Sequence, residues 1–255
     1  MREAKPGTTA RKVALNIITL GAVPGMDEVL PTGIVDATAT LLVESGAVGA
    51  TAVRWSRSKR MVSVCRAFDW MMPGQFETFA NRKAFCERQV GEGIRAGAGQ
   101  VLVLGAGHDT MGWRLAPEYS GVRFLEIDHP ATARLKAKGI DAMGRRANLY
   151  LIPEDLGKRQ LVDVVHASEV WDSAAPTVIV AEGLLMYLPP RRSGRCSISA
   201  PLSPAPVVGG LSPISTPVRT VGLMPALGQG WPCGSSRPVA SPGSGALAPK
   251  NSVPS

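Results

Sequence analysis

Four short apolar runs constrain the fold of this 255-residue chain more than any other feature of its sequence. They lie at 101–104 (VLVL), 123–127 (RFLEI), 149–152 (LYLI) and 177–180 (TVIV). Stretches of about 20 residues with helix or turn character separate the runs, which is typical of βαβ units. The pattern predicts an α/β fold with a parallel sheet and helices on both faces. Ligands of such sheets bind at the carboxyl ends of the strands.

The part of the chain before the first strand is expected to be helical. Residues 1–75 form a helical N-terminal leader in this interpretation, with one helix in the 9–20 region and a second near 34–42. The first helix is expected to be capped near Thr8 or Thr9. It would bury the apolar residues of its inner face, which are Val13, Ile17 and Leu20.

A longer helix is predicted at 76–94 and leads into the first strand. Phe79, Phe85 and Val90 lie broadly on one side of this helix, and charged residues lie elsewhere. The segment 76–190 therefore forms the predicted sheet domain, which follows the leader.

The chain changes character after Pro190. Residues 191–255 contain 11 of the 21 prolines and no Asp or Glu, and they show neither helical nor strand periodicity. An irregular tail without helices or strands is expected there, with C-terminal strands of the sheet missing. The tail is either a flexible linker or the product of a shifted reading frame near codon 190. The net charge of the chain is +8, and six cations lie in the tail, which leaves 8 − 6 = +2 for the first 190 residues. Because the positive charge belongs mostly to the tail, a nucleic-acid partner is not favoured.

Cysteine usage and hydropathy indicate a cytoplasmic protein. The four cysteines form no C-x-x-C pair, so neither a disulfide framework nor a zinc site is predicted, and the three histidines suggest no metal set. No apolar run approaches the ~20 residues of a membrane span. The N-terminus resembles a signal peptide, but Asn16 and Thr19 interrupt its apolar patch.

A glycine turn follows the first strand. The residues Gly105, Ala106 and Gly107 allow close approach of a ligand to the backbone, and the next helix offers free N–H groups. The dinucleotide fingerprint G-x-G-x-x-G needs a glycine at position 110, where this chain has Thr110. A nicotinamide or flavin cofactor is therefore disfavoured, although an ordinary βα turn remains an alternative.

An acidic pair ends the second strand. Of Glu126 and Asp128, Asp128 is preferred as the residue that binds a ribose diol, because it lies beyond the apolar run and a carboxylate can accept two hydroxyl hydrogen bonds. Glu126 is expected to be solvated or to face a helix. His129 is interpreted as a turn or cap residue in preference to a general base.

Acidic residues also follow the third and fourth strands. Asp155 is placed to accept a hydrogen bond from an adenine amine while Leu156 packs on the ring, or else Asp155 caps the next helix. Glu182 ends an apolar strand, where a carboxylate is costly unless a cation pairs with it. Together these strand ends describe a nucleoside site with a partly cationic occupant, which fits S-adenosylmethionine better than NAD.

The motifs VLVLGAGHDTMGWRL, RFLEIDHPATARLK, EDL and VIVAEGLLMYLPP, with GQFETFANRKAFCERQV before them, resemble the leucine carboxyl methyltransferase family. The resemblance covers about residues 10–190 and implies a Rossmann-like class I methyltransferase fold with S-adenosyl-L-methionine as cofactor. It also implies more strands than the four predicted. Roles implied for individual residues are binding of the methionine carboxylate (Arg82), the loop beneath it (Gly105, Ala106, Gly107), the ribose (Asp128), the adenine (Asp155, Leu156) and the amino group or sulfonium (Glu182).

The implied reaction is methyl transfer to an oxygen, namely a carboxylate or hydroxyl of a small molecule or peptide. Tyr187 is the candidate catalytic residue that orients the acceptor, or it packs against the sheet. The alternatives are a non-catalytic methyltransferase remnant and, less favoured, a Rossmann oxidoreductase. Neither a membrane nor a nucleic-acid partner is expected, and the sequence does not determine the methyl acceptor or the oligomeric state.

Overall fold

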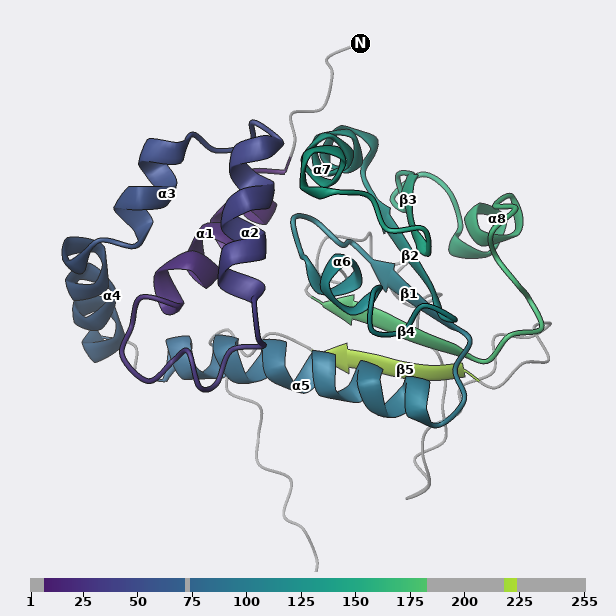
Figure 1. Cartoon of the computed structure of the whole chain (residues 1–255), viewed down its shortest axis with the longest axis horizontal. Helices are drawn as coiled ribbons and strands as arrows, with labels where there is room; N and C mark the ends of the chain where they lie inside the picture. The colour runs from purple at the N-terminus through teal and green to yellow at the C-terminus, as the bar shows by residue number, and fades with distance from the viewer. Residues whose placement is uncertain (1–6, 72–73, 183–217, 224–255) are drawn as a thin grey trace, which may run out of the picture. The chain divides into compact units, whose positions relative to one another are not determined.

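The computed structural model describes residues 7–71, 74–182 and 218–223, and within these ranges it contains one parallel sheet (Figure 1). Its strand order is β3-β2-β1-β4-β5. The strands are β1 (Gln100–Leu104), β2 (Arg123–Asp128), β3 (Leu149–Pro153), β4 (Thr177–Glu182) and β5 (Val218–Leu223). The four predicted strands are thus confirmed, as is the parallel sheet of an α/β fold.

The strand β5 corrects the expectation that no strand follows residue 190. It pairs in parallel with β4, from Thr177 opposite Val218 to Glu182 opposite Leu223. The six residues VRTVGL include three β-branched side chains, which favour a strand once a neighbouring strand edge is available. This strand was not predicted from the sequence because residues 191–255 as a whole are rich in proline. The predicted irregular segments at 191–217 and 224–255 lie outside the described residues.

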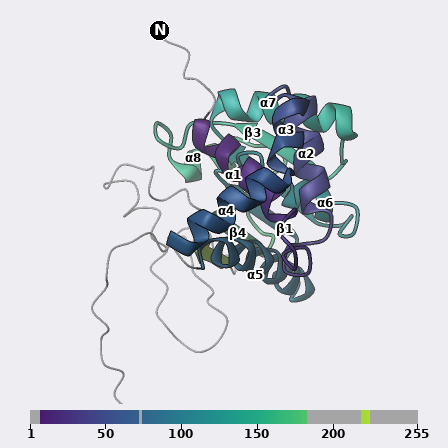
Figure 2. The same cartoon turned by 90° about the vertical axis from the view of Figure 1, so that its left-hand side faces the viewer.

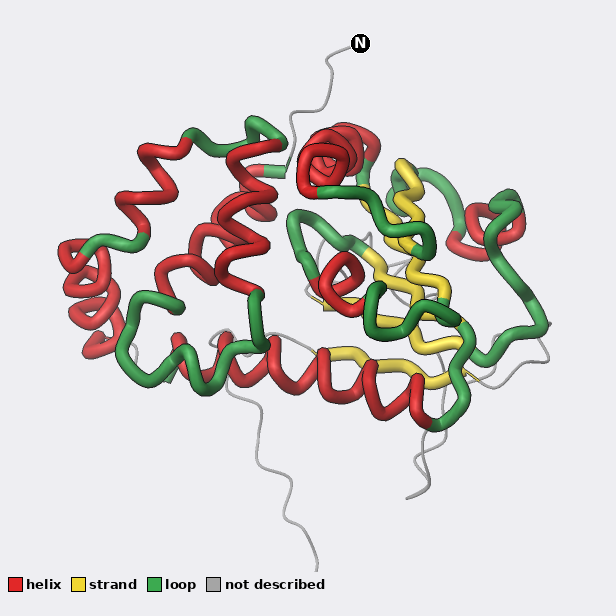
Figure 3. Tube along the Cα trace, viewed as in Figure 1, coloured by secondary structure: helices red, strands yellow, loops and turns green. Residues whose placement is uncertain are grey.

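The strand order creates a switch point between β1 and β4. The chain runs outward from β1 to β2 and β3, then returns to the other side of β1 to form β4 and β5 (Figure 3). The crevice at the carboxyl ends of two strands that flank such a switch point is the usual ligand position in open α/β sheets.

Helices cover both faces of the sheet, as predicted. They are α5 (Gln75–Arg95), α6 (Met111–Leu115), α7 (Pro130–Met143) and α8 (Leu161–His166). One face buries alternate strand residues such as Val101 and Phe124 against α5 and α6. The opposite face buries the intervening residues, including Leu102 and Leu125, against Val164 and neighbours in α8.

The helical leader contains α1 (Thr8–Leu20), α2 (Ile34–Glu44), α3 (Ala50–Ser56) and α4 (Lys59–Met71). A core cluster of Ile17, Leu20, Ile34 and Ala80 joins α1 and α2 to α5. The strands point toward α1 and α4, and these helices lie in front of the strand ends when seen from that side (Figures 1 and 2). The leader therefore faces the edge of the sheet at which a ligand is expected. The proposed domain boundary at residue 75 remains a prediction.

Two local expectations differ from the structure. The helix α1 begins at Thr8, but no side chain caps it, and Gly7 occupies the cap position. Phe85 is 36% exposed and stacks with Arg88, because the buried stripe of α5 runs through Ala80, Lys83 and Val90 instead. Because this stripe contains the charged residue Lys83, the sequence pattern did not identify it as the buried face of α5.

The contact between α2 and α7 depends on a glycine. A Cβ atom at Gly139 would lie 2.9 Å from the Leu41 carbonyl oxygen and 2.7 Å from Leu41 Cδ1. Backbone atoms cannot yield as a side chain can, so we expect Gly139→Ala to reduce the free energy of unfolding by about 1–3 kcal/mol despite the better helix propensity of alanine.

Urea unfolding checks this expectation, with Gly91→Ala in α5 as the control. A Cβ at Gly91 would meet the flexible guanidinium of Arg95 at 3.3 Å and the Tyr119 hydroxyl at 3.6 Å, so the control is expected to be neutral or stabilising. Equal stabilities of the two variants would contradict the proposed close packing of α2 on α7.

Candidate functional site

The carboxyl ends of β1, β2 and β4 lie level with one another. Leu104 pairs with Ile127 of β2 on one side and with Ala181 of β4 on the other. The glycine turn, Asp128 and Glu182, which follow these positions, are therefore at one edge of the sheet, as predicted. This edge is the candidate functional site.

The turn after β1 needs glycine at two positions. Gly105 and Gly107 have φ values of 67° and 52°, in the left-handed region that favours glycine. The Gly105 N–H donates to the Ile127 carbonyl at 2.8 Å, which ties the turn to β2. A Cβ at Gly107 would lie 3.3 Å from the Cβ of Ala10, so α1 approaches the turn closely.

Asp128 holds the glycine turn through its carboxylate. Its Oδ2 accepts a hydrogen bond from the Gly107 N–H at 2.5 Å, and its Oδ1 accepts one from the His129 N–H at 2.6 Å. A carboxylate has about four acceptor positions, so capacity remains for hydroxyl donors. His129 caps α7, because its Nδ1 accepts from the Ala131 N–H at 3.2 Å.

Glu126 faces a helix, which was one of its two expected positions. Both Glu126 and Lys136 of α7 have side chains only 2% exposed, and Glu126 Oε2 lies 2.5 Å from Lys136 Nζ. A Cβ at Gly112 would come within 2.6 Å of Glu126 Oε1, so the start of α6 also packs on this carboxylate. Glu126 is therefore a buried structural partner of Lys136 and is engaged away from the turn.

Asp155 organises the turn after β3. Its Oδ1 accepts from the Gly157 N–H at 2.9 Å, and its Oδ2 lies 3.3 Å from Lys158 Nζ. The helix α8 begins later, after Gln160, so Asp155 caps a turn and not that helix. Leu156 is partly buried against the core cluster beneath α8. The adenine contacts of these two residues remain predictions.

Glu182 is the centre of a buried ionic network. Its Oε1 accepts from Arg82 Nε at 2.8 Å, and its Oε2 accepts from Lys83 Nζ at 3.0 Å. Lys83 Nζ also donates to Asp109 Oδ2 at 2.5 Å. The predicted residues Arg82 and Glu182 are thus in direct contact, and the cations beside Glu182 belong to the protein itself. The pairing of Glu182 with the amino group or sulfonium of a cofactor remains a prediction.

Sequence reasoning missed Lys83 and Asp109. The signal for Lys83 was a lysine on the same helical stripe as Ala80, Cys86 and Val90, all of which are buried. Asp109 belongs to the quoted GAGHDT motif, but a role for it depends on Lys83, which lies 26 positions earlier in the sequence.

The charges of this network stabilise one another. Burial opposes ionisation of Lys83, but the Asp109 and Glu182 carboxylates outweigh it and raise the pKa of the lysine. Burial likewise opposes ionisation of Asp109, yet Lys83, helped by Lys136, holds the pKa of Asp109 well below its ordinary value. Burial, with the Glu182 carboxylate, raises the pKa of the nearby Cys86 thiol to about 12. Asp109 stays ionised, and the thiol of Cys86 stays neutral.

His108 is buried within the glycine turn. The residue is 3% exposed, and neither ring nitrogen has a hydrogen-bond partner in the described part of the chain. Burial, then the positive charges of Lys136 and Arg11, lowers the pKa of His108 from 6.5 to about 4. The imidazole is therefore neutral at physiological pH.

Acid is expected to destabilise the protein through His108. Between pH 6.5 and about 4 the unfolded chain binds a proton that the folded chain excludes, so stability falls as the pH falls through this range. The loss between pH 7 and pH 5 is expected to be roughly 2 kcal/mol. Urea unfolding of the unmodified protein and of His108→Gln at both pH values measures it, and identical pH dependence in the two proteins would contradict the assignment.

Other predicted features can be placed only in part. Tyr187 lies outside the described residues. Within those residues, no group of three or more His, Cys, Asp or Glu side chains is arranged to hold a metal ion, and Cys65 and Cys86 are free thiols. None of the helices in the described ranges is long and apolar enough to cross a membrane.

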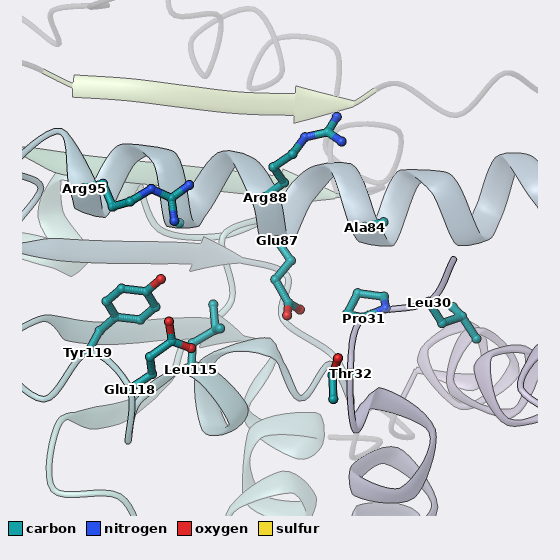
Figure 4. A pocket seen from close by; sticks show the side chains of 11 residues that line it. Leu30, Pro31, Thr32, Ala84, Glu87, Arg88, Arg95, Leu115, Glu118 and Tyr119 are labelled. Carbon is teal, nitrogen blue, oxygen red and sulfur yellow. The ribbon is translucent and has the colours of Figure 1, made fainter. Parts of the chain in front are cut away.

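A cleft of about 390 Å³ lies beside α5, away from the predicted site residues (Figure 4). Its lining includes Pro31, Glu87, Arg95 and Tyr119, and it contains none of the predicted cofactor-binding residues. Glu87 is already paired with Arg114, which also donates to the Thr32 carbonyl at 3.1 Å. Glu87 is therefore engaged in structure, and the strand ends remain the better candidate site.

A parallel sheet with a glycine turn and acidic side chains at its switch point defines a nucleotide-binding type of α/β protein. Comparison with known families is more specific, because the model of the family "Leucine carboxyl methyltransferase" matches residues 27–196. The chain belongs to the leucine carboxyl methyltransferase family, and the resemblance noted from the sequence motifs is confirmed.

Curated relatives match part of the chain. A protein of Mycobacterium tuberculosis named "Putative S-adenosyl-L-methionine-dependent methyltransferase" is 34% identical over 128 residues, which is 49% of this chain and 35% of that protein. A protein of the same name from Mycobacteroides abscessus is 34% identical over 166 residues, covering 64% of this chain and 52% of that protein. The chain thus spans about a third to a half of the length of these relatives.

Solved structures are only distantly similar. An O-methyltransferase family protein from Burkholderia thailandensis has a TM-score of 0.33 and 19% identity, covering 66% of this chain and 51% of that protein. The mitomycin 7-O-methyltransferase MmcR has a TM-score of 0.31 and 13% identity, with coverages of 74% and 76%. Similarity at this level carries no argument about function.

Proposed function

We propose that this protein binds S-adenosyl-L-methionine and transfers its methyl group to a carboxylate or hydroxyl oxygen of a small molecule or peptide. The observation that carries the proposal is the meeting of the glycine turn, Asp128 and the Arg82–Glu182 ion pair at one edge of the sheet. Family membership supports the cofactor, and the residues present fit it in both shape and charge.

The ion pair between Arg82 and Glu182 matches the amino-acid end of this cofactor. Arg82 offers a guanidinium for the carboxylate, and Glu182 offers a carboxylate for the ammonium group. In the structure the two side chains neutralise each other at 2.8 Å, with exposures of 19% and 12%. A zwitterion can replace that pairing with no net change of buried charge, which limits the desolvation penalty.

The glycine turn and Asp128 suit the nucleoside. Because Gly107 carries no side chain and its N–H is held by Asp128, backbone and carboxylate are fixed together at the end of β1. Asp128 is proposed to bind the ribose hydroxyls, while Asp155 and Leu156 are proposed to contact the adenine. The Rossmann oxidoreductase alternative is disfavoured by Thr110, because that position is a glycine in the dinucleotide fingerprint.

The bound cofactor supplies a sulfonium methyl group, whose S–C bond breaks as a new O–C bond forms and leaves a neutral thioether. A carboxylate acceptor is ionised at neutral pH, so the protein needs no strong base. Its contribution is then to hold the acceptor in line with the methyl group, and such alignment is worth roughly 7–11 kcal/mol in favourable cases. Tyr187 is the proposed catalytic residue for orienting the acceptor.

A non-catalytic remnant is the second candidate. The two candidates share the cofactor site and differ in turnover. Cofactor binding without methyl transfer to any of a panel of carboxylic acids and peptides would favour the remnant.

Asp128→Ala is expected to weaken binding of S-adenosylmethionine by about tenfold or more, because both carboxylate oxygens hold backbone of the site and hydrogen bonds to charged groups are strong. Isothermal titration measures the affinity. The control is Asp141→Ala, which removes an exposed carboxylate of α7 that is paired with Arg145. A folded Asp128→Ala protein that binds as well as the control would remove Asp128 from the site.

Arg82→Lys is also expected to weaken binding by about tenfold or more, because an ammonium group cannot reproduce the planar fork of a guanidinium on a carboxylate. The matched control is Arg88→Lys on the same helix, where the side chain is exposed beside Phe85. Titration with S-adenosylmethionine compares the two, and equal affinities would show that Arg82 does not bind the carboxylate.

A further inference from the structure

The buried side chain of Lys83 connects two loops of the proposed cofactor site. Its Nζ lies 2.5 Å from Asp109 Oδ2 and 3.0 Å from Glu182 Oε2, and the residue is 6% exposed. Resting on the proposed function, we infer that Lys83 is a positioning residue that holds the Glu182 carboxylate and the glycine turn in place for the amino-acid end of the cofactor.

Each carboxylate in this arrangement divides its two oxygens between different partners. Asp109 gives Oδ2 to Lys83 and Oδ1 to the Met111 N–H at 2.7 Å, which starts α6. Glu182 gives Oε2 to Lys83 and Oε1 to Arg82. Lys83 is therefore the link between α5, the turn after β1 and the end of β4. A lysine suits this link because its ammonium carries three donors on one point charge.

The balance of charges explains why Lys83 is needed when a zwitterionic ligand binds. In the described residues, Arg82 and Lys83 face Glu182 and Asp109, so two cations meet two carboxylates. When a ligand carboxylate takes Arg82, Lys83 remains as the counter-charge of Glu182. Glu182 then stays oriented by Lys83 through its Oε2, and its Oε1 is free to accept from the ligand ammonium.

Loss of the Lys83 charge is expected to make binding sensitive to pH. The groups around Lys83 are Arg82 and Cys86 on α5, Asp109 in the turn and Glu182 on β4, and Lys136 of α7 also acts on Asp109. Without Lys83, two buried carboxylates face one nearby guanidinium, so burial and mutual repulsion raise their pKa values. Protonation in mild acid then removes the acceptor for a ligand ammonium.

The variants are Lys83→Met, which removes the charge, and Lys83→Arg, which keeps it. Lys138→Met is the control, because it removes an exposed lysine of α7. Isothermal titration at pH 8 and pH 6 uses two probes, S-adenosylhomocysteine, which has the amino-acid end, and 5′-methylthioadenosine, which lacks it.

We expect Lys83→Met to bind S-adenosylhomocysteine about tenfold more weakly at pH 6 than at pH 8, because protonation of a buried carboxylate that has lost its lysine removes the acceptor of the ligand ammonium. The unmodified protein, Lys83→Arg and Lys138→Met are expected to change by less than about threefold. Binding of 5′-methylthioadenosine to Lys83→Met should not change between pH 8 and pH 6, because this probe has no ammonium group for Glu182 to accept. A general structural defect would weaken both probes alike at both pH values and would overturn the inference, as would a Lys83→Met protein without the pH effect.

If Lys83→Met does not fold, the double variant Lys83→Met with Asp109→Asn carries the test, because removing both partners of a buried pair is less costly than removing one. It keeps Glu182 without its lysine, so the same pH effect on S-adenosylhomocysteine is expected, and its absence contradicts the inference. Failure of the unmodified protein to bind either probe would instead refute the proposed function.

Discussion

Parallel pairing of β1 with β2 and β4 is the constraint on which the site depends. Because the register places Leu104 opposite both Ile127 and Ala181, the residues that follow the three strands emerge at the same height. The strand order changes direction at β1, and ligands of open α/β sheets bind at such a switch point. Side chains that are far apart in sequence, such as Arg82 and Glu182, can then meet as partners.

Charge burial at this edge is tolerated because Glu182, Asp109 and Glu126 each lie beside a cation. Glu182 and Asp109 share Lys83, Glu182 also has Arg82, and Glu126 has Lys136. An isolated buried carboxylate would be costly, whereas these ion pairs offset that cost and orient the carboxylate oxygens. The same arrangement leaves His108 as a neutral ring among cations. Ionisation state is thus determined by the packing of α1, α5 and α7 around the strand ends.

The helical leader contributes to the packing around the strand ends. Ala10 approaches the glycine turn, and Ala80 of α5 joins a core cluster with α1 and α2. Family membership rests on residues 27–196, which include most of the leader as well as the first four strands. The chain spans a third to a half of the length of the curated relatives it matches.

Local pattern in the sequence determined the four strands, the long helix before them and the glycine turn, because period and turn chemistry are properties of neighbouring residues. The positions of Asp128 and Glu182 at strand ends followed from the same pattern. Only the tertiary structure decided the strand at 218–223, which needed the open edge of β4, and the role of Lys83, whose partners lie 26 and 99 residues away. A buried lysine and an exposed one are the same letter in a sequence, and the difference between them is the set of carboxylates that folding brings near.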